Sequence, residues 1–133
     1  MSTPEFSEAE LRARLTPQQY HVTQEAGTEP AFANPFHDHT ADGTYQCVVC
    51  DEALFPSSTK YDSGTGWPSF YAPAAKGRVE DRVGRKWLVT LVENVCANCG
   101  AHLGHLFSDG TTPTNARYCI NSAALRFEPD VAT

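Results

Sequence analysis

The sequence predicts a mainly β domain, built as an antiparallel sandwich or rolled sheet with a short helical arm at its N-terminus. After residue 44, short runs of strand-forming residues alternate with turn residues, and little helical periodicity remains. Before residue 44, two helix start signals follow one another closely. The chain has 133 residues, enough to bury a core as a single domain. We expect a helical arm and loop at 1–43, followed by a β core at 44–129.

The arm is predicted to contain two short helices within residues 7–26. The run Ser7-Glu8-Ala9-Glu10 has the spacing of a capping box and precedes apolar residues. A second start signal lies at Thr16, with Pro17 at the first helical position and Gln19 three residues after the cap. Gly27 is expected to end the second helix, because glycine readily adopts the conformation that follows a helix C-terminus.

A loop is expected over residues 28–43, where two prolines occur and no periodicity is visible. His37 and His39 form an H-x-H pair there, which can bind metal but is expected at the surface of a polar loop. A hairpin turn is predicted at Val83–Lys86. The β core is predicted to contain strands at Thr44–Val48, Arg78–Val83, Trp87–Val92, Leu103–Phe107, Arg117–Ile120 and Ala124–Glu128.

The charge balance excludes some classes of partner. The net charge of −6 argues against wholesale binding to nucleic acid or to an anionic membrane. The first residues show no charged start followed by an apolar run, and no stretch resembles a transmembrane helix. We therefore expect a cytoplasmic protein, in which Cys-x-x-Cys spacing indicates metal binding or catalysis before structural disulfides.

Four of the five cysteines form two Cys-x-x-Cys pairs, Cys47/Cys50 and Cys96/Cys99. Two such pairs can supply four thiolates to one tetrahedral zinc ion, a closed site of structural type. Redox disulfides and an iron–sulfur cluster are the alternatives, but the first would need a thioredoxin-like βαβ pattern that this chain lacks. The sequence therefore predicts one structural Zn²⁺ that joins distant strands.

The fifth cysteine, Cys119, lies in the predicted strand Arg117–Ile120 and is a candidate nucleophile. Because strand side chains alternate between faces, Arg117, Cys119 and Asn121 should share one face, with Tyr118 and Ile120 toward the core. A nearby cation favours the reactive thiolate. The alternative is a small buried cysteine that serves only as a hydrophobe.

Two further groups of residues could contribute to a site. Gly64-Thr65-Gly66-Trp67 is a glycine-rich turn that presents a tryptophan, either as the wall of a ligand pocket or as a packing residue. His102 and His105 follow the second cysteine pair, and histidine is the usual proton donor or acceptor near neutral pH. They could equally be structural histidines whose hydrogen bonds are satisfied within the fold, or metal ligands that replace a cysteine.

These motifs together resemble the B-type methionine-(R)-sulfoxide reductases, from about residue 8 to residue 128. The resemblance rests on Gly66–Phe70, Cys96–Cys99, His102–His105 and Arg117–Ser122, which occur in the family's order. It implies two antiparallel sheets packed as an open sandwich, with zinc far from the active site. It also implies Cys119 as the nucleophile, with His102, His105 and Asn121 binding and protonating the sulfoxide oxygen. Trp67 and Phe107 would hold the S-methyl group, and Arg117 is a further substrate-binding candidate.

The resemblance implies that the Cys119 thiolate attacks the sulfoxide sulfur of the R epimer of methionine sulfoxide in oxidised proteins or peptides, and that Cys119 becomes a sulfenic acid. Many family members have a resolving cysteine at the position that Thr65 fills here. An outside thiol is therefore expected to restore Cys119, either thioredoxin, a glutaredoxin or a small thiol. We expect a monomer. A zinc-stapled binding module and a zinc hydrolase with His102 or His105 as a metal ligand remain the alternatives.

Overall fold

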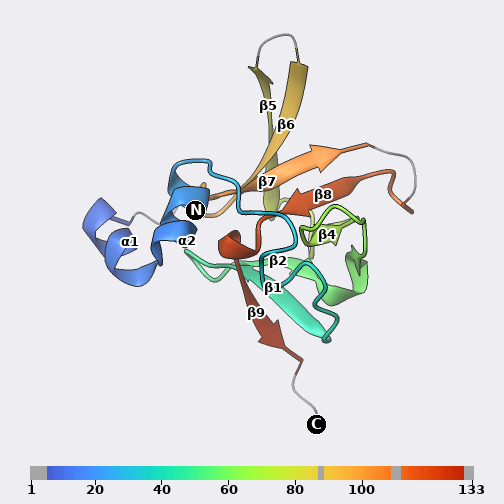
Figure 1. Ribbon diagram of the computed structural model, residues 1–133, viewed down its shortest axis with the longest axis horizontal. Helices are drawn as coiled ribbons and strands as arrows, with labels where there is room; N and C mark the ends of the chain where they lie inside the picture. Colours follow the sequence, from blue (N-terminus) through green and yellow to red (C-terminus); the bar gives the residue numbers. More distant parts are fainter. Residues whose placement is uncertain (1–5, 87–88, 109–111, 131–133) are drawn as a thin grey trace.

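The computed structural model describes residues 6–86, 89–108 and 112–130, and it confirms a mainly β fold with two antiparallel sheets (Figure 1). One sheet has three strands in the order β2-β1-β9, and the other has six in the order β3-β4-β8-β7-β6-β5. The strands are β1 (Gly43–Cys47), β2 (Ala53–Pro56), β3 (Lys60–Tyr61), β4 (Ser69–Phe70), β5 (Val79–Lys86), β6 (Val89–Cys96), β7 (His102–Phe107), β8 (Arg117–Ile120) and β9 (Leu125–Pro129).

Buried aromatic rings join the two sheets. Phe55 of β2 stacks on Phe70 of β4 with ring centroids 4.5 Å apart, and Tyr45 of β1 meets Phe70 edge-on at 5.1 Å. All three side chains are completely buried. Because stacked and edge-to-face pairs are favourable ring geometries, this cluster fixes the three-stranded sheet against the six-stranded one.

The helical arm has the two helices that the sequence predicts, α1 (Glu8–Arg14) and α2 (Pro17–Gln24). Thr16 and Gln19 form a complete capping box at the start of α2. The predicted role of Gly27 is wrong, because Ala26 is the residue with left-handed backbone, at φ 55°. None of the described helices is long and apolar enough to cross a membrane. Two short 3-10 helices complete the described elements, η1 (Ser57–Thr59) and η2 (Ser122–Ala124).

Most predicted strands occur in the structure within a few residues of their predicted bounds, and β8 matches its prediction at both ends. The hairpin turn predicted at Val83–Lys86 is wrong, because β5 continues to Lys86, which pairs with Val89 of β6. Trp87, the predicted start of the next strand, lies outside the described residues. Figure 1 shows β5 and β6 as a long hairpin that extends away from the rest of the molecule. The sequence analysis missed the short strands β2, β3 and β4.

The loop between α2 and β1 contains no helix or strand, and hydrogen bonds attach it to both the glycine-rich turn and η2. The backbone N–H of Phe32 donates to the carbonyl oxygen of Gly66 at 2.8 Å. His39 is half-buried rather than at the surface, and its Nδ1 lies 2.6 Å from the hydroxyl of Tyr45. The loop therefore packs against parts of both sheets.

Candidate active site

Cys119 lies in the middle of the six-stranded sheet, on β8 between β4 and β7. It is paired in register with Ser69 on one side and with His105 on the other. β7 passes so close to β8 that a Cβ atom on Gly104 would lie 2.1 Å from the carbonyl oxygen of Cys119. Glycine at position 104 therefore permits the approach that places His105 beside the thiol.

A cavity of about 330 Å³ opens at Cys119. It brings together most of the residues that the sequence predicts for the site. Arg117, Cys119 and Asn121 all line it, whereas Ile120 is completely buried on the other face, as strand alternation requires. The lining residues are Thr28, Thr65, Trp67, His105, Phe107, Arg117, Cys119 and Asn121. Thr28 is the one that sequence reasoning missed, since a threonine in a loop carries no signal of its own.

His102 does not line this cavity, but it packs against His105 with ring centroids 5.7 Å apart. The two residues are three positions apart, so a regular strand would place them on opposite faces. A β-bulge removes the conflict, because Asn94 pairs with Gly104 and the next residue, Val95, pairs with His102. Bulges near active sites commonly redirect a side chain in this way.

His102 is only 6 % exposed, and both of its ring nitrogens are buried without a hydrogen-bond partner. Glu93 is paired with His105 across β6 and β7, and ligand atoms of Glu93, His102 and His105 all lie within 4.8 Å of one another. Burial lowers the pKa of His102 below its ordinary value, and the Glu93 carboxylate opposes this shift. Burial therefore favours the neutral form of the His102 imidazole.

Glu29, which the sequence analysis missed, connects three parts of the site. Its backbone N–H donates to Oδ1 of Asn121 at 3.0 Å, and its carbonyl oxygen accepts from Nε1 of Trp67 at 2.9 Å. Its buried carboxylate accepts from the backbone N–H groups of Ser122 and Ala123, at the start of η2. One loop residue thus orients both the amide and the indole that face the cavity.

The surroundings of Cys119 favour its protonated thiol over the thiolate. Burial raises the pKa of Cys119, and contacts with Thr65, Arg117 and Ser69 oppose this only in part. The sequence analysis expected the Arg117 cation to favour the thiolate. The cation has that effect here, but burial of the sulfur outweighs it. The guanidinium of Arg117 lies over the Phe107 ring, 4.4 Å from its centroid.

The four remaining cysteines form a separate cluster. Their sulfur atoms lie within 4.8 Å of one another, with Cys47 and Cys99 3.6 Å apart and Cys50 and Cys96 also 3.6 Å apart. None of the four takes part in a disulfide. Four thiolates at about 2.3 Å from a tetrahedral zinc ion would be separated by nearly this distance. The cluster can therefore hold a metal ion, and none of its members lines the cavity at Cys119.

Comparisons with known proteins agree with this arrangement. The family model described as the SelR domain matches residues 15–129. The chain is 53 % identical over 124 residues to the mouse methionine-R-sulfoxide reductase B3, mitochondrial, covering 93 % of this chain and 49 % of the relative, about half its length. It is 48 % identical over 123 residues to the peptide methionine sulfoxide reductase MsrB of Agrobacterium fabrum, covering 92 % of this chain and 91 % of the relative. The chain therefore belongs to the SelR domain family.

Proposed function

We propose that this protein is a methionine-(R)-sulfoxide reductase that acts on oxidised proteins and peptides. The observation that carries the proposal is the cavity, in which a free cysteine shares the lining with a histidine, an asparagine and an indole. The relatives reported above are named for the same activity. The R epimer comes from the name of the mouse relative, and the chemistry comes from the residues.

Cys119 is the nucleophile in this proposal. Its sulfur attacks the sulfoxide sulfur, the S–O bond of the substrate breaks, and oxygen passes to Cys119 to give a sulfenic acid and methionine. The substrate is reduced by two electrons, and Cys119 is oxidised by two. The proton that the thiol loses is the one that the sulfenic acid carries, so the exchange needs no proton from outside.

His105 is the residue that we assign to proton transfer. It is the register partner of Cys119 and lines the same cavity, so an imidazole lies beside both the thiol and the position of the sulfoxide oxygen. His102 packs behind it. The Asn121 amide is fixed by Glu29 on one side and by the carbonyl oxygen of Leu103 on the other. It is placed to donate a hydrogen bond to the oxygen.

We assign discrimination between sulfoxide epimers to two sets of lining residues, one apolar and one polar. A sulfoxide sulfur carries an oxygen, a methyl group and the rest of the side chain in a fixed pyramid. Among the lining residues, Trp67 and Phe107 offer apolar surface for the methyl group, and His105 and Asn121 offer polar groups for the oxygen. With Cys119 fixed on the third side, only one epimer places both groups correctly. Arg117, which also lines the cavity, places its guanidinium over the Phe107 ring.

An outside thiol completes the cycle in this proposal, because Thr65 holds the position of a resolving cysteine. Thioredoxin, a glutaredoxin or a small thiol could serve. The Cys47, Cys50, Cys96 and Cys99 cluster would hold one structural Zn²⁺, which fastens the turn after β1 to the turn between β6 and β7 and takes no part in the reaction.

The test is an assay with separated R and S epimers of a methionine sulfoxide peptide and dithiothreitol as reductant. The R epimer should be reduced, and the S epimer should remain. Without reductant, the reduced protein should form about one methionine per chain, because each Cys119 reacts once. Equal rates for the two epimers would contradict the proposal, and no reaction with either would favour the binding-module alternative.

A further inference from the structure

Phe32 is an exposed aromatic residue in an unfavourable backbone conformation. Its side chain is 64 % exposed, and its φ of 62° lies in the left-handed region that bulky residues rarely adopt. Residues in such conformations persist where the surrounding structure holds them, and they concentrate at ligand-binding sites. This combination calls for an explanation other than packing.

The glycine-rich turn holds Phe32 in place. The Phe32 N–H donates to the carbonyl oxygen of Gly66, and the Asn34 amide donates to the same oxygen, both at 2.8 Å. A Cβ atom on Gly66 would lie 2.6 Å from the Phe32 ring, so only glycine allows the ring to rest there. The turn therefore holds the Phe32 ring against Gly66, the residue that precedes Trp67.

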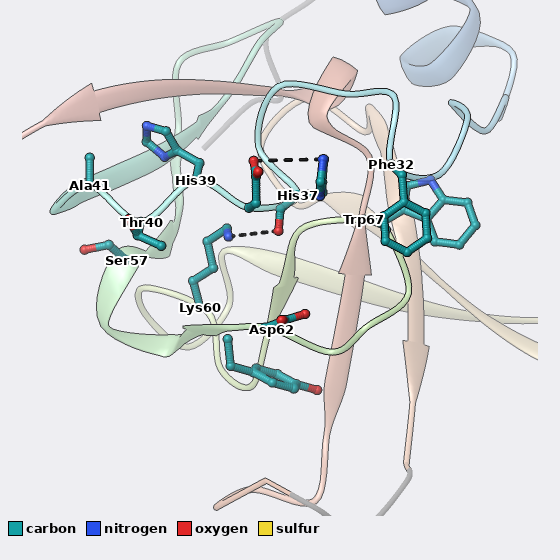
Figure 2. A pocket seen from close by; sticks show the side chains of 12 residues that line it. Phe32, His37, His39, Thr40, Ala41, Ser57, Lys60, Asp62 and Trp67 are labelled. Atoms are coloured by element: carbon teal, nitrogen blue, oxygen red, sulfur yellow. Dashed lines mark hydrogen bonds and ion pairs between the residues drawn. The ribbon is translucent and has the colours of Figure 1, made fainter.

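Phe32 borders a second cavity, of about 390 Å³, which lies between the loop and β3. Trp67 lines both this cavity and the one at Cys119, so the two share a wall. In Figure 2, the Phe32 and Trp67 rings lie at one end of the second cavity, and Ala41 lies at the other. Its volume falls within the range of ligand pockets, about 300–1,000 Å³.

The second cavity offers charges of both signs. Lys60 lies within it, with Nζ 3.4 Å from the carbonyl oxygen of His37, and Asp38 and Asp62 line it as well. Such a mixture of donors and acceptors does not select a strongly charged ligand. It suits a peptide backbone, which presents N–H donors and carbonyl acceptors in turn. An exposed aromatic ring beside it suits an apolar side chain.

We propose that Phe32 and this second cavity bind the polypeptide that flanks the oxidised methionine, with an apolar neighbouring side chain against the Phe32 ring. The inference rests on the proposed function. When the methionine side chain of a peptide enters the Cys119 cavity, the flanking residues of that peptide remain outside the cavity, on the protein surface. Because Trp67 lines both cavities, the second cavity is adjacent to the first, and we infer that the flanking chain reaches it. The site thus contributes to affinity for peptides and not to the chemical step.

The experiment compares two substrates of the R epimer, N-acetyl-methionine sulfoxide N-methylamide and a nine-residue peptide with leucine on both sides of the sulfoxide. The variant is Phe32→Gly, which removes the ring and adopts the left-handed backbone without steric cost. We expect KM for the peptide to rise about tenfold, the size of one lost aromatic contact, with kcat unchanged. Both constants for the short amide should stay within about twofold of wild type.

Three further variants make the result decisive. Phe32→Trp should retain peptide binding, and Val83→Ala, at another exposed hydrophobic residue, should behave as wild type. If Phe32→Gly fails to fold, Phe32→Asn replaces it, since asparagine tolerates the left-handed region. An equal loss on both substrates would show that Phe32 only positions Trp67, and no loss on either would show that the surface is unused. An inactive wild type would instead overturn the proposed function.

Discussion

The hydroxyl of Thr65 lies 3.8 Å from the sulfur of Cys119. Two serines of the same region support the hydroxyl: Ser63 Oγ lies 2.8 Å from Thr65 Oγ1 and 2.7 Å from Ser69 Oγ. The glycine-rich turn thus brings its side chain at position 65 directly to the nucleophile. The sequence alone does not show how closely position 65 approaches Cys119. That distance decides whether a cysteine at position 65 could react with Cys119.

Thr65→Cys should convert the protein to an enzyme with a resolving cysteine. The new sulfur would start about as far from Cys119 as the hydroxyl does, and closing to the disulfide length of about 2.05 Å requires a modest shift of the turn. After one turnover without reductant, peptide mass mapping should find a disulfide between the introduced cysteine and Cys119 in the variant. Wild type should instead carry a trappable sulfenic acid at Cys119.

A different pairing would contradict this cycle. A disulfide from Cys119 to one of the four clustered cysteines, with metal released in proportion, would show that a cluster cysteine resolves the sulfenic acid. The matched control is Thr65→Ser, which keeps the hydroxyl and should form no disulfide.

Cys119→Ser should fold and keep its metal but lose sulfoxide reduction. Cys119 lies outside the cysteine cluster, and a serine hydroxyl is a far weaker nucleophile than a thiol near neutral pH. His105→Ala should be slower rather than inactive, by about 10²–10⁴-fold, the usual contribution of proton transfer. Circular dichroism and metal analysis check the fold, and the dithiothreitol assay checks turnover. Near wild-type turnover by Cys119→Ser would remove the nucleophile from the proposal.

The elements that the sequence predicts well depend on local signals. The capping box at Thr16 fixes the start of α2, and alternation along Arg117–Ile120 fixes which side chains meet the cavity. Both are properties of a few adjacent residues. They need no information about the rest of the chain.

The features that the sequence does not predict depend on distant partners. Glu29 acts on residues 92 to 94 positions away, and no pattern near position 29 indicates this. The bulge that brings His102 to His105 arises from how β6 pairs with β7. The pKa of Cys119 depends on how deeply the folded chain buries the sulfur, which outweighs the cation that the sequence does show.

Cys50→Ser should give a metal-poor and weakly folded protein. The cluster joins β1 to β6 through turns that are distant in sequence, and structural zinc in small peptides contributes about 10–16 kcal/mol, comparable to a domain's total stability of about 5–15 kcal/mol. Metal analysis and thermal unfolding measure the effect, and a strong chelator applied to wild type should reproduce it. A well-folded, fully active Cys50→Ser protein would show that the cluster is dispensable.

Alkylation of Cys119 should accelerate with pH well into the alkaline range. Burial raises the pKa of Cys119, so its thiolate fraction at pH 7.5 is smaller than that of an ordinary cysteine with a pKa of about 8.5. Iodoacetamide rates measured from pH 6.5 to 10 should rise about tenfold per pH unit at first, with a midpoint above that of a cysteine peptide. Cys119→Ser provides the background rate. A plateau below pH 7.5 would mean that the Arg117 cation lowers the pKa of Cys119 more than burial raises it.

Glu29→Gln should weaken both the fold and the site. Each oxygen of the Glu29 carboxylate accepts one backbone N–H of η2, and the amide of a glutamine in its place has only one oxygen to accept with. A buried donor left without a partner costs about 1–3 kcal/mol. Since the backbone of residue 29 also fixes Asn121 and Trp67, we expect kcat to fall together with stability. Urea unfolding and the R-epimer assay measure the two effects, with Glu25→Gln on the exposed end of the arm as the control.

The stability difference between wild type and Glu29→Gln should depend on pH, and this dependence tests the ionisation of Glu29. Burial raises the pKa of the folded Glu29 carboxyl above its ordinary value of about 4.3, so the folded chain holds the proton more tightly than the unfolded chain. The stability that this tighter proton binding contributes is fully present below the pKa of the unfolded chain. It is lost as the pH rises through the pKa of Glu29 in the folded chain. Wild type should therefore gain stability relative to Glu29→Gln as the pH falls from 7 toward 4.5. A difference that shrinks over this range would mean that the two N–H donors, rather than burial, govern the pKa of Glu29.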